Sequence, residues 1–233
     1  MSQLRVRYQT IEFGDIDIHL RTLRNLQEYQ DNHRIAENLG ISSAIWSLFG
    51  VVWPSSLVLA WFLRNYQLRD KRILEVGCGI GLVSLLLNHL QADITATDYH
   101  PEAGEFLRQN VQLNNGRDIP FVRTSWADMT DSGLGLFDLI VGSDLLYEAA
   151  YVDLLADFIE RHAKSCCEVV IVDPGRGHHS KFSRCMVERG YEHSRRKPES
   201  DHFLEKPFGG WILRYRRPKG VCLKKSDGAG RRS

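Results

Sequence analysis

The chain has few cysteines, and their arrangement excludes two common kinds of stabilisation. The five cysteines are odd in number, and none of them stands in a C-x-x-C pattern. Neither a disulfide framework nor a zinc site is therefore predicted, and such cysteine usage is typical of a reducing compartment. His178 and His179 are adjacent, which puts them on different faces of any helix, and no Cys or carboxylate completes a metal-ligand spacing there. We predict a cytoplasmic protein without a metal.

The chain also lacks an excess of charge of either sign. Lys and Arg number 30 against 29 Asp and Glu, so no overall field draws the protein to nucleic acid. The balance changes only at the end, where Asp227 is the single acid after Arg214. Residues 218–233 are basic and partly small and polar, which predicts a disordered tail, either without function or in contact with an acidic partner.

An uninterrupted membrane-spanning run is absent as well, and the N-terminus has no apolar signal core. Residues 41–63 carry no charge, but Gly50, Pro54 and several serines break the run. Trp53-Pro54 divides it into a loop and a helix that starts at Pro54. We therefore predict that this segment is buried or lines a site, and that the protein does not cross a membrane.

What the chain does contain is an alternation of strands and helices over 233 residues, enough for one sheet-based domain. Apolar alternation around Gly14 predicts an N-terminal β-hairpin. The rest predicts an α/β fold, a Rossmann-like, doubly wound, mainly parallel sheet with helices on both faces. The expected parts are an extension (1–40), a main domain (41–217) and the tail (218–233). The predicted strands are 73–76, 94–97, 121–124, 137–141, 168–173 and 211–215, and the predicted helices are 82–90, 101–115, 152–159 and 179–189, besides the one that starts at Pro54.

The stretch from Lys71 to Asp98 is the most informative part of the sequence. A short apolar strand is followed by the turn Gly77-Cys78-Gly79-Ile80-Gly81, an apolar helix, and a second strand that ends at Asp98. This order predicts one nucleotide-binding half of a doubly wound sheet. The Asp98 carboxylate is then placed to bond the two hydroxyls of a ribose.

The glycine spacing indicates which nucleotide is bound. A dinucleotide fingerprint is G-x-G-x-x-G, but Leu82 occupies the position of its third glycine. A carboxylate at Glu75, just before the turn, would repel a pyrophosphate and attract the amino group of S-adenosylmethionine. The helix N-terminus beyond Gly81 would receive the carboxylate of that ligand. We predict S-adenosylmethionine as the cofactor, with a nicotinamide-dependent oxidoreductase as a weaker alternative.

Two further pairs of residues follow strands and should lie at the same edge of the sheet. Trp126 would lie on an adenine face with Asp128 accepting from the exocyclic amine, or else Trp126 only fills the core. Asp144 and Tyr147 belong to Asp144-Leu145-Leu146-Tyr147, which would also fit a helix that starts with Asp144 as its N-cap. The segment 173–176 (D-P-G-R) is either a tight turn or a means of presenting an arginine to a carboxylate.

Together these motifs resemble the seven-β-strand protein lysine methyltransferases, chiefly the members that act on valosin-containing protein or on the electron transfer flavoprotein β-subunit. The resemblance rests on 75–81 (E-V-G-C-G-I-G), Asp98, the D-x-x-Y of 144–147, Trp53-Pro54 and the D-P-G-R of 173–176. Ser55 and Ser56 depart from it, since the flavoprotein-directed branch tends to have glycines there. It covers roughly 40–217 and implies a seven-stranded sheet with an antiparallel C-terminal strand.

The resemblance also implies which residues form the site. The catalytic residues would be Asp144 and Tyr147. The cofactor-binding residues would be Trp53, Glu75, Gly77, Gly79, Gly81, Asp98, Trp126, Asp128 and Ser143.

The implied reaction is an in-line transfer of a methyl group from a sulfonium to a neutral lysine amine of a protein substrate, in which orientation supplies about 7 to 11 kcal/mol. We expect Asp144 to attract and orient the amine, and the ring of Tyr147 to form a wall that removes water from it, while the proton leaves to water. A methyltransferase for a small amine or pyridine, and a non-catalytic partner-binding module on the same fold, remain as alternatives.

Overall fold

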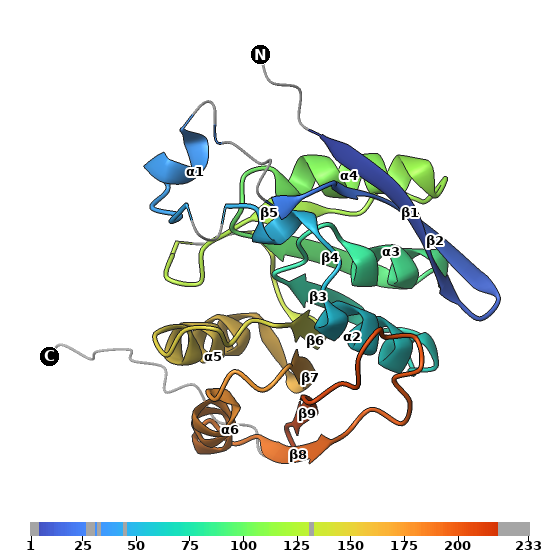
Figure 1. The fold of residues 1–233 in the computed structure, drawn as a ribbon. Coiled ribbons are helices and arrows are strands. Elements are labelled where there is room, and N and C mark those ends of the chain that lie inside the picture. The colour runs from blue at the N-terminus through green and yellow to red at the C-terminus, as the bar shows by residue number, and fades with distance from the viewer. Residues whose placement is uncertain (1–4, 27–30, 32–33, 44–45, 131–132, 219–233) are drawn as a thin grey trace, which may run out of the picture.

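A single seven-stranded sheet organises the chain in the computed structural model (Figure 1), which describes residues 5–26, 31, 34–43, 46–130 and 133–218. The strand order is β5-β4-β3-β6-β7-β9-β8. Strands β3 to β7 pair in parallel with their neighbours among themselves, and β9 runs antiparallel to β7 and β8. The strands are β3 (Arg72–Val76), β4 (Asp93–Asp98), β5 (Phe121–Arg123), β6 (Phe137–Ser143), β7 (Ala163–Asp173), β8 (Glu192–Arg196) and β9 (Trp211–Arg216). The predicted fold class is confirmed.

Helices cover both faces of this sheet and create two hydrophobic cores. One core lies under α2 (Pro54–Arg64), α3 (Leu82–His89) and α4 (Ala103–Leu113), and the other under α5 (Tyr151–His162) and α6 (His179–Glu188). Alternate side chains of each strand enter opposite cores, as expected from the two-residue period of a strand. In β7, for example, Val170 and Val172 face the first core while Val169 and Ile171 face the second.

The N-terminal hairpin is confirmed, and it packs on the first of these cores. β1 (Val6–Phe13) pairs with β2 (Ile16–Leu23), and Gly14 takes a φ of 70° in the two-residue turn that joins them. The hairpin extends across the layer of α3 and α4 (Figure 1). Its inward side chains join the first core, and they are Phe13, Ile16, Ile18, Leu20 and Leu23.

The chain then passes through a short α1 (Ile35–Asn38) and a 3-10 turn, η2 (Leu48–Gly50), before α2 begins. Pro54 is the first residue of α2, where a missing N–H costs nothing. No described helix has the length and hydropathy required to span a bilayer.

One strand escapes the sequence pattern. β8 has the sequence Glu-His-Ser-Arg-Arg, which shows no apolar alternation. Such a strand is tolerated here because β8 forms the edge of the sheet and is largely exposed. It is held by antiparallel pairing with β9, and the guanidinium of Arg195 lies 4.5 Å from the ring centroid of Trp211. The predicted tail falls on 218–233, of which 219–233 lie outside the described residues.

Candidate active site

A cavity of about 640 Å³ lies beyond the carboxyl ends of β3, β4, β5 and β6. The turn after β3, the residues after β4, β5 and β6, and the segments before α2 all contribute to its lining. This is the edge at which doubly wound sheets bind ligands. The predicted site residues that line it are Trp53, Gly77, Gly79, Asp98, Trp126, Ser143, Asp144 and Tyr147.

The glycine turn is shaped so that only glycine fits. Gly77, Gly79 and Gly81 have φ values of 64°, 54° and 82°, in the left-handed region that other residues rarely adopt. A Cβ added at Gly79 would lie 2.9 Å from the backbone oxygen of Phe49, and one at Gly77 would lie 2.5 Å from Leu145. The turn therefore approaches its neighbours closely, and a side chain at Gly77 or Gly79 would collide with them.

Gly81 itself does not line the cavity but starts α3. It is the residue that precedes the first helical position, Leu82. A Cβ at Gly81 would lie 2.3 Å from Leu107 of α4, so the absence of a side chain lets α3 and α4 pack closely.

Asp98 ties the end of β4 to this turn. Its Oδ2 accepts a hydrogen bond from the N–H of Gly79 at 2.8 Å, and its Oδ1 accepts one from the N–H of His100 at 2.8 Å. Burial raises the pKa of Asp98 above its ordinary value, and the amide donors oppose that rise. The carboxylate is thus fixed in orientation while it borders the cavity, as a ligand for two hydroxyls must be.

Glu75 lies behind the turn rather than in the lining. Its side chain is buried, and Oε2 accepts hydrogen bonds from the backbone N–H of Ser84, at 2.9 Å, and from the Ser84 hydroxyl. Burial raises the pKa of Glu75 to about 8. In this structure the residue holds the first turn of α3 against β3. Direct contact between Glu75 and a ligand remains a prediction.

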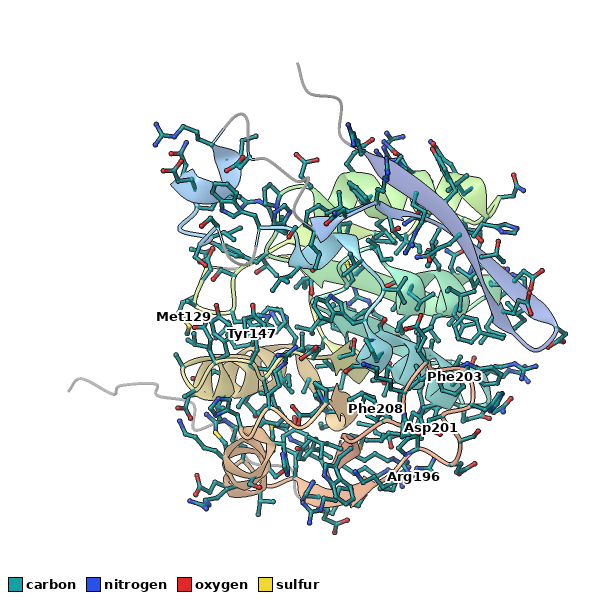
Figure 2. All side chains as sticks on the ribbon, in the orientation of Figure 1. Met129, Tyr147, Arg196, Asp201, Phe203 and Phe208 are labelled. Atoms are coloured by element: carbon teal, nitrogen blue, oxygen red, sulfur yellow. The ribbon has the colours of Figure 1, made fainter. Side chains whose placement is uncertain are left out.

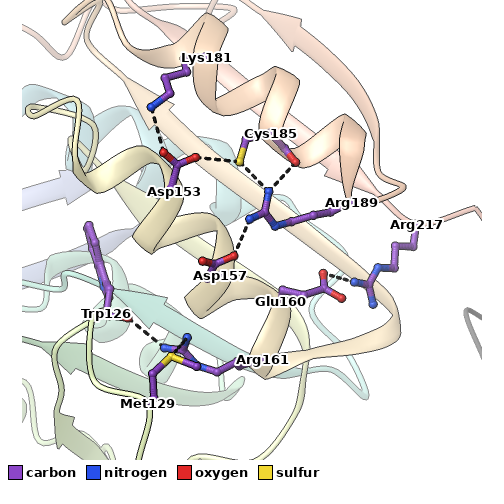
Figure 3. A network of polar contacts seen from close by, with 10 residues as sticks. All are labelled: Trp126, Met129, Asp153, Asp157, Glu160, Arg161, Lys181, Cys185, Arg189 and Arg217. Carbon is purple, nitrogen blue, oxygen red and sulfur yellow. Dashed lines mark hydrogen bonds and ion pairs between the residues drawn. The ribbon is translucent and has the colours of Figure 1, made fainter. Parts of the chain in front are cut away.

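Trp126 and Asp128 lie on the same loop after β5, and their joint contact with an adenine stays a prediction. Trp126 lines the cavity, whereas Asp128 is exposed and accepts hydrogen bonds from the N–H and the hydroxyl of Thr130 at 2.9 and 2.8 Å. Arg161 of α5 holds their loop by donating to the backbone oxygens of Trp126 and Asp128 at 3.0 and 3.2 Å, and Figure 3 shows it beside Trp126 and Met129.

Asp144 and Tyr147 line the cavity just after the end of β6. The alternative in which Asp144 caps a helix is wrong, because α5 begins only at Tyr151 and Asp144 has a φ of 56°. Its backbone N–H instead donates to the oxygen of Val172 in β7 at 2.9 Å. Arg176 donates to both carboxylate oxygens of Asp144, from Nε at 2.6 Å and from Nη2 at 2.8 Å.

Aromatic rings connect Tyr147 with the loop after β5. Tyr147 and Tyr151 meet edge to face at 5.0 Å, and Tyr151 meets Trp126 in the same way at 5.6 Å. Burial, followed by the neighbouring Tyr151, raises the pKa of Tyr147, so its hydroxyl stays protonated at neutral pH. In Figure 2 Tyr147 and Met129 lie on the α5 side of the molecule, away from Phe203. The ring of Tyr147, 36% exposed, thus forms part of the rim.

The turn after β7 combines both alternatives offered for it. Gly175 donates its N–H to Oδ2 of Asp173 at 2.9 Å, which closes a tight turn, while Arg176 reaches the cavity lining. His179 lies 3.6 Å from the same carboxylate. Among the described residues, no group of three or more His, Cys, Asp or Glu is arranged to hold a metal ion.

Trp53 is fixed by the loop that precedes it. Its indole N–H donates to the oxygen of Leu48 at 2.8 Å, and Ser56 donates its hydroxyl to the backbone oxygen of Trp53 at 2.7 Å. The serine that stands where the resembled branch tends to have glycine thus stabilises the first turn of α2. The uncharged segment 41–63 contributes to the cavity, as predicted.

Sequence reasoning missed several lining residues. The ring of His100 stacks on Phe49 at 3.9 Å, and burial lowers the pKa of His100 to about 4, so it is neutral. Tyr99 donates its hydroxyl to the backbone oxygen of Leu39, which ties the α1 segment over the end of β4. Tyr99 and His100 follow Asp98 directly, a position that could have signalled them; Leu39 has no such signal.

The comparisons with known proteins agree with this geometry. A family model described as lysine methyltransferase matches residues 30–186. The chain belongs to the lysine methyltransferase family. The resemblance predicted from the motifs is thereby confirmed.

This member of the lysine methyltransferase family is similar both to curated proteins and to solved structures. The electron transfer flavoprotein beta subunit lysine methyltransferase of Xenopus laevis is 33% identical over 165 residues, covering 69% of this chain and 65% of the relative. Protein N-lysine methyltransferase METTL21A of Danio rerio is 35% identical over 151 residues, covering 60% and 66%. The chain spans about half to two thirds of the length of the curated relatives it matches. The ribosomal protein L11 methylase of Lactobacillus delbrueckii subsp. bulgaricus shares the fold, with a TM-score of 0.56 at 19% identity over 70% of this chain and 79% of that one.

Proposed function

We propose that this protein is an S-adenosylmethionine-dependent methyltransferase that methylates the ε-amine of a lysine in a protein substrate. One observation carries the proposal: the glycine turn, Asp98, Asp144 and Tyr147 all line the same cavity. The names of the related proteins support a protein lysine as the acceptor. We propose 41–217 as the catalytic unit, 1–40 as an extension that supports it, and a cytoplasmic location, in accord with the free cysteines among the described residues.

The residues present fit S-adenosylmethionine in shape and charge. Gly77 and Gly79 line the cavity and carry no side chain, so a ligand there can approach the backbone of the turn closely. Among the described lining residues the acids are Asp98, Asp144 and Glu148, and Arg176 is the one Lys or Arg. Such a lining favours cations, and both a sulfonium and a lysine are cations. The cofactor would supply a methyl group already activated by the positive sulfur.

The protein then has to position and desolvate the amine. A lysine with an ordinary pKa of about 10.4 costs about 4.6 kcal/mol to deprotonate at pH 7. Asp144 would attract the ammonium to the cavity, and the aromatic rings of Tyr147 and Tyr151 would remove water from it and favour the neutral form once the proton has left to water. Alignment of the neutral amine behind the methyl group would provide the remaining acceleration.

The test uses methyl-tritiated S-adenosylmethionine and an extract of the protein's own host that lacks the gene. Protein, nucleic acid and small molecules are separated after incubation. The expected result is label in a discrete protein, on lysine by mass spectrometry of the digested band, and its loss in Asp144→Asn. Arg108→Ala, which removes a similar two-pronged ion pair on α4, is the matched control. Label only in small molecules, or no label while the cofactor binds by calorimetry, would contradict the proposal.

A further inference from the structure

The ion pair between Arg176 and Asp144 occupies the position that the acceptor amine needs. Both oxygens of Asp144 are engaged, at 2.6 and 2.8 Å, by the Nε and Nη2 of Arg176. If Asp144 receives the ammonium of the acceptor, that ammonium and the guanidinium compete for the same two oxygens. Charge-assisted bonds in this parallel arrangement are among the strongest in proteins, so their replacement requires compensation.

The pair lies where two neighbouring parallel strands end. Asp144 follows β6 and is anchored by its N–H to Val172 of β7, while Arg176 comes from the turn after β7. The Asp144 side chain is 11% exposed and that of Arg176 is 42% exposed. The carboxylate is therefore the enclosed partner, and the guanidinium is the one that can leave towards solvent.

The backbone around Arg176 favours such a departure. Gly175 and Gly177 flank it with φ values of 102° and 92°, and a Cβ built at either would meet nothing within 4 Å. Glycines in open space allow the turn to change conformation at little cost. The anchor of the turn, the bond from Gly175 to Asp173, does not involve the side chain of Arg176.

Another carboxylate would compensate for the ion pair that Arg176 loses when it leaves Asp144. Asp144 and Asp173 are the carboxylates that raise the pKa of Arg176. Asp173 is 1% exposed, its Oδ2 accepts from Gly175, and its Oδ1 has no hydrogen-bond partner, so this carboxylate lies in the interior and not on the side towards which the guanidinium would leave. Two sources of a compensating carboxylate are then left, Glu148 of the cavity lining and the molecule that brings the amine.

We propose that Arg176 selects the acceptor: the incoming lysine takes its place on Asp144, and the released guanidinium binds an Asp or Glu of the same substrate. Arg176 is thus a specificity-determining residue for lysines with a neighbouring acidic side chain. This inference rests on the proposed function, since it assumes that a protein lysine enters the cavity.

The first experiment measures steady-state kinetics on the protein labelled in the host extract, once it is purified. Arg176→Ala is expected to raise the KM for this acceptor by about tenfold or more, the effect of losing a hydrogen-bonded charge partner, with a smaller change in kcat. Arg176→Lys should restore part of the loss, and Arg108→Ala should change neither parameter. A fall in KM would show that Arg176 only competes with the acceptor, and a fall in kcat at constant KM would show that it only positions Asp144; either result overturns the inference.

The second experiment changes the acceptor. Each Asp or Glu near the methylated lysine is replaced by its amide and combined with Arg176→Ala in a double-mutant cycle. One amide substitution should reproduce the rise in KM and add nothing in the presence of Arg176→Ala, because both remove the same contact. Strict additivity at every acid, or no acid near the lysine, overturns the inference. Failure of the proposed function is distinguishable, because then the wild-type protein labels no protein at all.

Discussion

Two parts of the cavity lining, named here the cofactor end (the glycine turn and Asp98) and the acceptor end (Asp144, Tyr147 and the turn of Arg176), are built in opposite ways. At the cofactor end a Cβ at Gly77 or Gly79 would collide with its neighbours, and two backbone N–H groups fix Asp98. At the acceptor end Gly175 and Gly177 lie in open space, and Tyr147 is 36% exposed. The difference matches the two tasks: a cofactor of constant shape permits a rigid cradle, whereas a lysine carried by another molecule requires a part that can give way.

The largest effect is expected from Gly79→Ala at the cofactor end. Alanine at a φ of 54° costs about 1 to 2 kcal/mol, and its methyl would also lie 2.9 Å from the backbone oxygen of Phe49, which cannot rotate away. We expect the affinity for S-adenosylmethionine to fall at least about tenfold, since about 1.4 kcal/mol corresponds to a factor of ten. Isothermal calorimetry with a circular dichroism check of folding measures this. Unchanged affinity would show that the turn is not the cradle.

Glu75→Gln should reveal a pH dependence of stability at the same end. Burial raises the pKa of Glu75 to about 8 from an ordinary 4.5, so between these values the folded state binds a proton that the unfolded state lacks. Stability is therefore lost as the pH rises from about 4.5 to 8. Glutamine can still accept from Ser84 and carries no charge.

Urea unfolding of Glu75→Gln and wild type at several pH values tests this. As the pH rises, the free energy of unfolding of the variant should increase relative to that of the wild type, by a few kcal/mol at pH 8. Each unit of pKa difference corresponds to about 1.4 kcal/mol. Equal dependence on pH in both proteins would show that the Glu75 carboxylate is ionised at no cost in the folded state.

Two asparagines of α4 attach the N-terminal hairpin to the rest of the domain, and their substitution tests how much this attachment stabilises the fold and the cofactor end. Asn110 accepts from the N–H of Arg21 at 2.6 Å and donates to the oxygens of Arg21 and Ile80 at 3.2 and 3.0 Å. Asn114 pairs in the same way with the N–H and oxygen of His19, at 2.8 and 2.7 Å. The side chains thus act as a third strand along β2, and Asn110 also reaches the glycine turn.

Asn110→Ala should cost about 3 kcal/mol and Asn114→Ala about half of that, since Asn110 is fully buried and its loss strands buried backbone groups, whereas the bonds of Asn114 to His19 are exposed. Urea unfolding measures both, and hydrogen exchange at Arg21 and His19 localises the change. Asn110→Ala should also weaken cofactor binding while Asn114→Ala should not. If Asn114→Ala had the larger effect on stability and on cofactor binding, the contact of Asn110 with the glycine turn would not support the cofactor end.

The sequence predicted the arrangement of the cofactor end better than that of the acceptor end. The glycine spacing and the acid after β4 are compatible with one local geometry. Gly77, Gly79 and Asp98 were therefore predicted to lie together, and they do. The pairing of Asp144 with Arg176 joins turns 32 residues apart, and each motif alone allowed another structure. β8 was not predicted because a polar strand held by backbone pairing shows no alternation of apolar residues. The asparagine contacts were not predicted because hydrogen bonds from a side chain to a distant backbone leave no pattern in the sequence.

The smallest effect on stability should come from Gly175→Ala, and it sharpens the contrast with Gly79→Ala. A residue with a Cβ at a φ of 102° is strained by about 1 kcal/mol or somewhat more, but nothing lies within 4 Å to clash, so the exposed turn can relax. We expect little change in unfolding free energy and no change in affinity for S-adenosylmethionine. The stiffer turn should instead hinder Arg176 from leaving Asp144, which lowers kcat/KM for the acceptor. Cofactor binding by calorimetry and methyl transfer on the same protein separate these effects; weaker cofactor binding would mean that the two ends are not independent, and unchanged transfer would mean that the turn need not move.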